Sequence, residues 1–221
     1  MLARPSKVDR FCQICKVHRM KATRPPTESA RVEQVLTVAL EVFGRHGFRK
    51  TSMEDVARAA DLSRQGLYLH FPNKEILFQA AVRHELDTAL DEVSQCLNKE
   101  SGGLDRRIVS AMDAWLGRYV GSMLASDIST MLENPASQLK DIVEPAIAAF
   151  DAQVAATIAS ATTKTDLRRL RVTPEDVAAV LHTAGQGAKY LSRSRDEFVA
   201  RITAATHLVL AGLHTTSSAR R

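Results

Sequence analysis

The sequence has few cysteines, few aromatic residues and no long apolar run. Three cysteines are too few for a disulfide framework in a chain of 221 residues, which favours a reducing compartment. No run of about 18 apolar residues is present, which argues against a transmembrane helix. The N-terminus also lacks the apolar stretch and the small-residue cleavage site of a signal peptide. We therefore expect a cytoplasmic protein with no membrane partner.

Motifs of common enzymes are missing as well. The sequence has no glycine-rich phosphate loop after a strand, no His-Glu-x-x-His and no Gly-x-Ser-x-Gly. Its seven histidines are scattered along the chain and do not cluster. No convergent set of catalytic residues stands out, so we expect a protein that is not an enzyme and needs no cofactor.

Helical periodicity begins after Pro25-Pro26 and continues through most of the chain. No segment of useful length alternates apolar and polar residues as a half-buried strand would. The sequence therefore predicts an all-α fold, with an N-terminal three-helix helix-turn-helix domain and a C-terminal helical domain. The expected helices are one ending near Gly47, two short ones between Thr51 and Phe71, a long one from Asn73 to about Leu97, and others over 104–124, 138–160, 174–191 and 195–213.

The predicted organisation has four parts: a basic extension over 1–26, a helix-turn-helix domain over 27–87, a regulatory and dimerisation domain over 88–214, and a tail over 215–221. The formal net charge of +5 is concentrated in the extension, because residues 1–24 hold seven basic side chains and one acidic one. Such an arm is typical of a nucleic-acid tether, although a merely soluble tail has the same composition.

The segment from Thr51 to Phe71 carries the most informative pattern. A capping-box start opens its first short helix, and Ser63 can cap the second after a turn at Asp61. This is the geometry of a DNA-reading helix-turn-helix. Arg binds guanine edges and Gln binds adenine edges, so the polar side of the second helix suits the major groove. That side is predicted to carry Arg64, Gln65, Tyr68 and His70, while Gly66 leaves room for a close backbone approach.

The stretch from Thr51 to Glu75, with its core Leu67-Tyr68-Leu69-His70-Phe71, resembles the DNA-binding domain of TetR-family repressors. The resemblance covers about residues 28–85, and Asp61 stands where the family often has Gly. It implies a dimer bound to a palindromic DNA operator and released by a small-molecule inducer. It also implies phosphate contacts from Thr51 or Ser52, Tyr68 and Lys74, base contacts near Arg64, Gln65 and His70, and minor-groove contacts from Lys21 and Arg24.

The C-terminal part holds a few large side chains that suit either a ligand pocket or ordinary bundle core. The candidates for an apolar or aromatic ligand are Met112, Trp115, Tyr119, Met123, Phe150 and His182. The last helix is apolar on more than one face, which predicts that a second copy of the chain covers one of these faces. The expected homodimer interface comprises Val177, Val180, Leu181, Ala184, Phe198, Ile202, Ala205 and Val209.

The N-terminal extension contains Cys12, Cys15 and His18 at a spacing typical of metal ligands. A structural zinc site normally has four ligands, and no second pair follows at zinc-finger spacing. Three interpretations stay open: a small zinc or redox element, an inert basic extension, or translation that starts at Met20. No other metal site is expected.

Three classes of function fit these patterns. The first is a ligand-responsive transcriptional repressor, which the resemblance favours. The second is an activator or nucleoid-like DNA binder that uses the same domain without an inducer. The third, a small helical enzyme, lacks a supporting set of catalytic residues.

Overall fold

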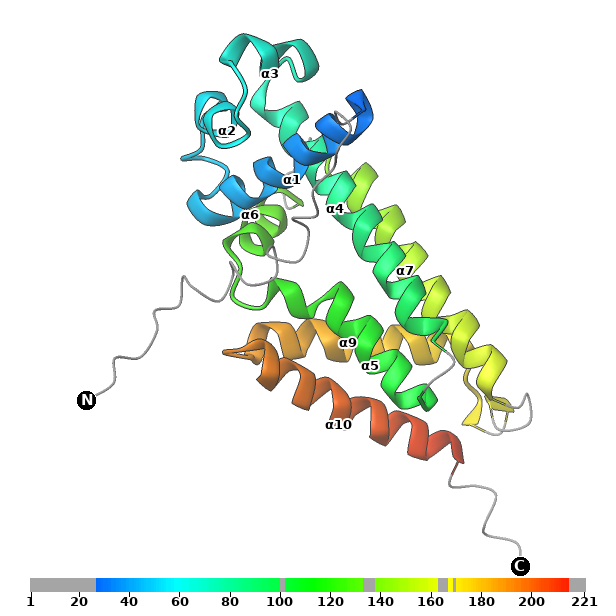
Figure 1. The fold of residues 1–221 in the computed structure, drawn as a ribbon. Coiled ribbons are helices and arrows are strands. Elements are labelled where there is room, and N and C mark those ends of the chain that lie inside the picture. Colours follow the sequence, from blue (N-terminus) through cyan, green and yellow to red (C-terminus); the bar gives the residue numbers. More distant parts are fainter. Residues whose placement is uncertain (1–26, 100–101, 133–137, 163–166, 169, 215–221) are drawn as a thin grey trace, which may run out of the picture.

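The computed structural model describes residues 27–99, 102–132, 138–162, 167–168 and 170–214. Over these residues the predicted all-α fold is confirmed (Figure 1). The helices are α1 (Glu28–His46), α2 (Met53–Ala59), α3 (Arg64–His70), α4 (Lys74–Leu97), α5 (Leu104–Trp115), the 3₁₀ turn η2 (Gly117–Tyr119), α6 (Met123–Leu132), α7 (Lys140–Ala161), α9 (Pro174–Leu191) and α10 (Arg195–His214).

Side-chain caps determine where the N-terminal helices begin. Ser52 and Asp55 form the predicted capping box of α2, and the Ser63 hydroxyl accepts the Gly66 N–H at the start of α3. Between α2 and α3 the chain reverses at Asp61, whose φ of 55° lies in the left-handed region. An Asp tolerates this conformation better than most residues do, so the turn forms without a glycine.

One expected helix is wrong in its extent. The segment 104–124 is broken after Trp115 and resumes as α6 at Met123. Gly121 has a φ of 70°, which ends any helical continuation. A Cβ at Gly117 would overlap Asp113 Oδ1 and lie 3.2 Å from Phe198 Cδ1, so a side chain at this turn would displace the Asp113 carboxylate.

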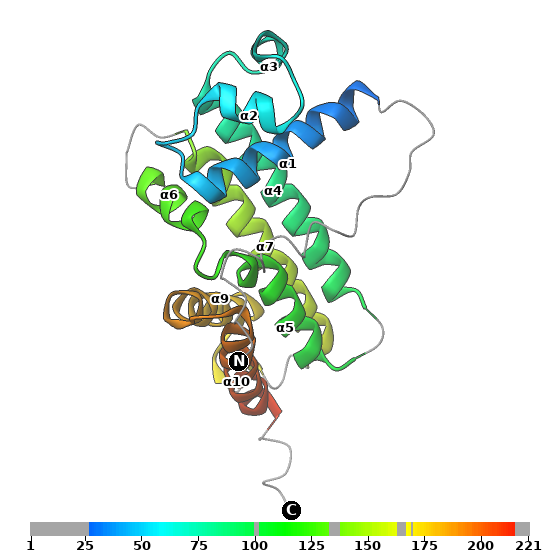
Figure 2. The same cartoon turned by 60° about the vertical axis from the view of Figure 1, so that its left-hand side comes forward.

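The helices form one continuous body (Figures 1 and 2). Its buried residues make two hydrophobic cores. The first core joins α1, α2, α3 and the first half of α4 with α6 and the first turn of α7, and it centres on Phe43 and Phe78, whose rings meet edge to face at 5.0 Å. The second core joins α5, α9 and α10 with the later turns of α4 and α7. In it Trp115 and Phe150 stack at 5.0 Å.

Helix α7 contradicts the expectation that no segment is long and apolar enough to cross a membrane. With a mean hydropathy of 1.4, it is the one helix in the described part of the chain that is long and apolar enough to cross a membrane. However, it packs against α4, α5 and α9, and Phe150, Val154 and Ile158 are buried there. The core helix of a soluble protein has the same length and composition, so α7 is weak evidence for a membrane segment.

Candidate functional site

Helix α3 lies at one end of the molecule (Figure 1). Leu67 is fully buried and holds the helix against the first core. Arg64, Gln65 and Tyr68 lie on the opposite, exposed face, as predicted from the sequence. The Arg64 guanidinium lies 5.5 Å from the centroid of the Tyr68 ring, which restrains this long side chain. The face therefore offers one guanidinium and one amide to a nucleic-acid groove.

Two residues of α3 differ from the prediction. His70 lies off this face, and its Nε2 is 3.5 Å from Glu28 Oε1 on α1. Its ring lies beside α1 but remains exposed, and the base contact inferred for His70 stays a prediction. Leu69, which was not predicted, is 81% exposed beside Tyr68. An exposed apolar residue on a recognition helix can contact a thymine methyl group.

Lys74, expected to bind a phosphate, stabilises the loop before α2. Its ammonium donates hydrogen bonds to the carbonyls of Phe48 and Thr51, both at 3.0 Å, and lies 4.5 Å from the centroid of the Phe48 ring. The same loop is held from α6, because the Phe48 N–H donates to Asp127 Oδ2 at 2.7 Å. Lys74 thus ties the start of α4 to the loop that positions α2.

The two hydroxyl candidates at the start of α2 lie in different environments. Thr51 is buried, and its hydroxyl donates to the Gly47 carbonyl at 2.9 Å, so the phosphate contact predicted for Thr51 or Ser52 suits Ser52 better and stays a prediction. Ser52 is exposed at the N-cap of α2. Hydrogen bonds from the Ser52 hydroxyl and N–H lower the pKa of Asp55, which keeps this carboxylate ionised and the cap closed. Of the two, only Ser52 is accessible.

The other predicted contacts lie outside the described residues. These are Lys21 and Arg24 of the arm, and the metal candidates Cys12, Cys15 and His18. Within the described part of the chain, no group of three His, Cys, Asp or Glu side chains could hold a metal ion.

Truncating Arg64 is expected to relax sequence preference. An Arg64→Ala change should cost about 1–3 kcal/mol against the preferred base pair, because the guanidinium no longer reaches a base edge. The measurement is fluorescence anisotropy with an operator and a set of its single-base variants. Arg58→Ala is the matched control, since Arg58 is exposed on α2 and pairs only loosely with Asp55, at 3.8 Å. An unchanged base preference in Arg64→Ala would rule out the readout role.

Lys74→Met is expected to lower the melting temperature and to weaken DNA binding. Two backbone carbonyls lose a charged donor, at a cost of about 1–2 kcal/mol. Thermal unfolding should show the loss, while Lys50→Met, an exposed lysine of the same loop, should leave stability unchanged. If the change also reduces the slope of log DNA affinity against log salt concentration by about one, Lys74 contacts a DNA phosphate directly as well. A melting temperature equal to wild type would contradict the loop-holding role.

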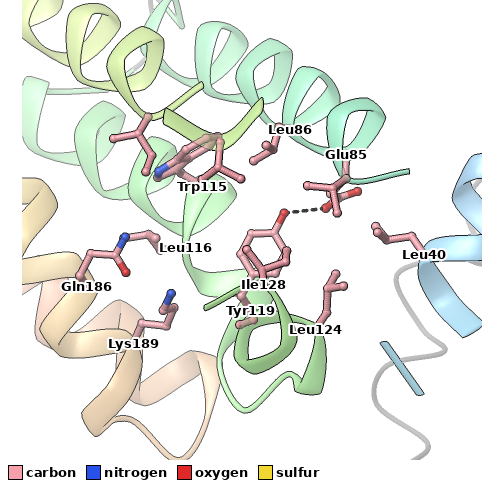
Figure 3. A pocket seen from close by; sticks show the side chains of 14 residues that line it. Leu40, Glu85, Leu86, Trp115, Leu116, Tyr119, Leu124, Ile128, Gln186 and Lys189 are labelled. Atoms are coloured by element: carbon pink, nitrogen blue, oxygen red, sulfur yellow. Dashed lines mark hydrogen bonds between the residues drawn. The ribbon is translucent and has the colours of Figure 1, made fainter. Parts of the chain in front are cut away.

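A second feature is a cavity of about 110 Å³ between the two cores (Figure 3). Its wall is mostly apolar and comes from α1, α4, α5, η2, α6, α7 and α9. The polar groups in the wall are Glu85 on α4, Tyr119 on η2, and Gln186 and Lys189 on α9. Segments far apart in the chain therefore meet at one small space, which suits a ligand with an apolar body.

A buried network occupies the α4 side of this cavity. Tyr119 donates its hydroxyl hydrogen to Glu85 Oε1 at 3.0 Å, and Arg118 Nη1 donates to the same oxygen at 2.8 Å. Arg118 also pairs with Glu92. Burial raises the pKa of Tyr119 well above its usual range, so the phenol remains a neutral donor.

The predicted ligand residues divide into two groups. Trp115 and Tyr119 line the cavity. Met112, Phe150 and His182 do not, because they are buried in the second core behind Trp115. The His182 ring is also fully hydrogen-bonded: its Nδ1 is 2.7 Å from Asp151 Oδ1, and its Nε2 is 3.2 Å from Gln186 Nε2. The side chain of Met123 lies outside the described residues.

The residues predicted for a dimer interface are mainly core residues of one chain. Val177, Leu181, Phe198 and Ile202 are buried between α5, α9 and α10, so within one chain they already serve as core residues, and the interface predicted for them stays untested. Apolar residues that face the core of one chain and apolar residues that face a partner recur with the same helical period. The sequence alone therefore does not distinguish core residues from interface residues. Val180 is exposed, whereas Ala184, Ala205 and Val209 are half-buried. The outward faces of α9 and α10 instead comprise Ala179, Val180, Thr183, Gly187, Leu191, Ala204, Leu208, Ala211 and Gly212.

Comparison with protein families confirms the resemblance given by the sequence. Residues 35–81 match the model of bacterial regulatory proteins of the tetR family. The segment is similar to the HTH-type transcriptional regulator RutR of Escherichia coli, with 39% identity over 59 residues that cover 27% of this chain and 28% of RutR. The HTH-type transcriptional repressor KstR2 of Rhodococcus jostii is 31% identical over 90 residues, which cover 38% and 43% of the two chains. The matches thus span less than half of either relative.

Solved structures extend the likeness in fold to most of the chain. A tetR-family transcriptional regulator from Streptomyces coelicolor has a TM-score of 0.60 at 20% identity, covering 86% of this chain and 84% of that one. The transcriptional regulator FadR from Bacillus subtilis, in complex with stearoyl-CoA, has a TM-score of 0.59 at 14% identity and covers 82% and 98%. The arrangement of an N-terminal helix-turn-helix and a C-terminal helical domain is shared with these structures.

Proposed function

We propose that this chain is a homodimeric DNA-binding regulator of transcription. Its residues 35–81 match the tetR-family model. In this proposal it is a repressor that binds a palindromic operator and leaves it when a small molecule binds. The observation that carries the proposal is the exposed Arg64, Gln65 and Tyr68 face of α3, held on a capped helix-turn-helix. Positive groups of the arm, including Lys21 and Arg24, would add phosphate or minor-groove contacts.

The homodimer is supported by the outward faces of α9 and α10. Val180 is 55% exposed, Leu191 67% and Leu208 76%, which is unusual for large apolar side chains. A Cβ at Gly187 or Gly212 would meet nothing within 4 Å, so a partner helix has room to approach. A two-fold dimer through these faces would present two copies of α3 to two half-sites.

The internal cavity favours a ligand-responsive regulator over a DNA binder without an inducer. Leu124 and Ile128 of α6 line the cavity, and Asp127 of the same helix accepts the Phe48 N–H from the loop before α2. A ligand that shifts α6 would therefore alter the loop that Lys74 also holds. This is a physical connection between the cavity and the helix-turn-helix, with two sites that can influence one another.

The division into 27–87 and 88–214 follows as part of the proposal. Most residues of the first core precede the boundary and most of the second follow it, but Leu124, Ile142 and Val143 of the later part also belong to the first core, and α4 runs without a break through the boundary. The remaining parts of the proposal are that the protein is cytoplasmic and that it is not an enzyme.

Footprinting tests the proposed function. The DNA upstream of the protein's own gene and of its divergent neighbour should contain a protected inverted repeat. A thermal-shift screen should then find a compound that stabilises the protein and also releases this DNA. Protection without any releasing compound would favour the activator or nucleoid-like alternative. The absence of sequence-specific protection on any DNA would contradict the proposal.

A further inference from the structure

The cavity wall contains a cation that lacks a counter-ion. Within the described part of the chain, no carboxylate forms an ion pair with Lys189, and its Nζ lies 5.2 Å from the centroid of the Tyr190 ring. Burial lowers the pKa of Lys189, which reflects the cost of removing its ammonium from water. A desolvated charge of this kind is stabilised strongly by an anion that binds next to it.

The opposite side of the cavity is different, because its charge is already compensated. Glu85 accepts hydrogen bonds from Arg118 and Tyr119. Figure 3 shows Glu85 on the α4 side, while Gln186 and Lys189 come from α9 across the cavity. A cationic ligand would have to compete with the Arg118 ion pair for Glu85. Among the described residues, the charge in the wall that remains open to a ligand is therefore positive.

The size of the cavity limits the body of such a ligand. An engineered protein cavity of about 150 Å³ binds benzene. The space here, about 110 Å³, suits one six-membered ring or a chain of about six carbons. Its walls include Trp115, Leu86 and Ile128, so that body is apolar. A long acyl chain would require the cavity to enlarge.

We infer that this cavity binds a small apolar monocarboxylate, with the carboxylate beside Lys189 and Gln186 and the apolar body against Trp115 and Ile128. The inference rests on the proposed function, in which the cavity is the ligand site. It adds the chemical class of the ligand and the residue that recognises its charge.

The test uses titration calorimetry on the full-length protein with two matched pairs of probes, benzoate with benzamide and hexanoate with hexanamide. In each pair the two molecules have nearly the same shape and differ in charge. Wild type should bind at least one carboxylate and should bind its amide about 10- to 100-fold more weakly. Comparing benzoate with hexanoate distinguishes an aromatic from an aliphatic ligand. Lys189→Met should weaken carboxylate binding by the same factor and leave amide binding unchanged.

Lys99→Met serves as the control, because Lys99 is exposed at the end of α4 and outside the cavity. DNA binding of each unliganded variant is measured separately, so that a failure of the ligand class is distinguished from a failure of the DNA-binding proposal. Binding of neither carboxylate at millimolar concentration would overturn the inference. Equal affinity for acid and amide, or equal weakening of both by Lys189→Met, would also overturn it.

Discussion

The double change Val180→Glu and Leu208→Glu is expected to convert the protein into monomers and to reduce operator affinity by more than about 100-fold. Both side chains are exposed in the single chain, so the fold should tolerate them as acids. In a two-fold interface they would place four carboxylates in a dry apolar surface, at a cost of several kcal/mol. A monomer would then bind one half-site only and lose the advantage of bivalent attachment.

Size-exclusion chromatography with light scattering at micromolar concentration measures this change. Wild type should have twice the 24.3 kDa mass of one chain, and the double variant should have that mass itself. Leu170→Glu is the matched control, because Leu170 is 40% exposed but lies outside α9 and α10. A wild-type protein that elutes as a monomer would refute the dimer, and a double variant that stays dimeric would move the interface elsewhere.

Phe150→Ala is expected to destabilise the fold by about 3–5 kcal/mol and to lower the melting temperature by roughly 10 °C. Phe150 is fully buried, stacks on Trp115 at 5.0 Å and meets the His182 ring edge to face at 5.2 Å. Its loss leaves a void that these neighbours, held in the second core, cannot fill. The measurement is thermal unfolding followed by circular dichroism.

Phe150→Leu provides the comparison, because it keeps an apolar side chain and should cost less than half as much. Below its transition temperature, Phe150→Ala should still bind the operator, since the first core does not contain this residue. An unchanged melting temperature would contradict the position of Phe150 in the core behind the cavity.

The helix-turn-helix was predictable because its signals are local. Ser52 with Asp55, Ser63, and the buried spacing of Leu67 and Phe71 are all close in sequence, and each acts within one or two turns. The structure confirms the exposed Arg64 and Gln65 for the same reason.

The features that the sequence did not predict come from contacts between distant segments. Lys74 meets the carbonyl of Phe48, which lies 26 residues earlier, and no local pattern predicts that hydrogen bond. The Thr51 hydroxyl turns inward to a carbonyl, and His70 turns towards α1. Polarity alone therefore did not predict that the Thr51 hydroxyl is buried.

The cavity could be predicted only in part. Trp115 and Tyr119 were identified because large residues four apart share one helical side, although a break in the helix separates them. Glu85, Gln186 and Lys189 were missed, because charged and amide residues on a helix are usually solvated. Their shared position depends on how α4 and α9 pack on α5. That packing is tertiary information.

The central claim is that this chain reads DNA as a two-fold dimer through α3. The most direct test is selection of bound fragments from random double-stranded DNA by the full-length wild-type protein, followed by sequencing. The account predicts enrichment of one inverted repeat, with half-sites about one helical turn apart or a multiple of it. Recovery of no enriched sequence, or of a single asymmetric motif bound by one chain, would contradict it.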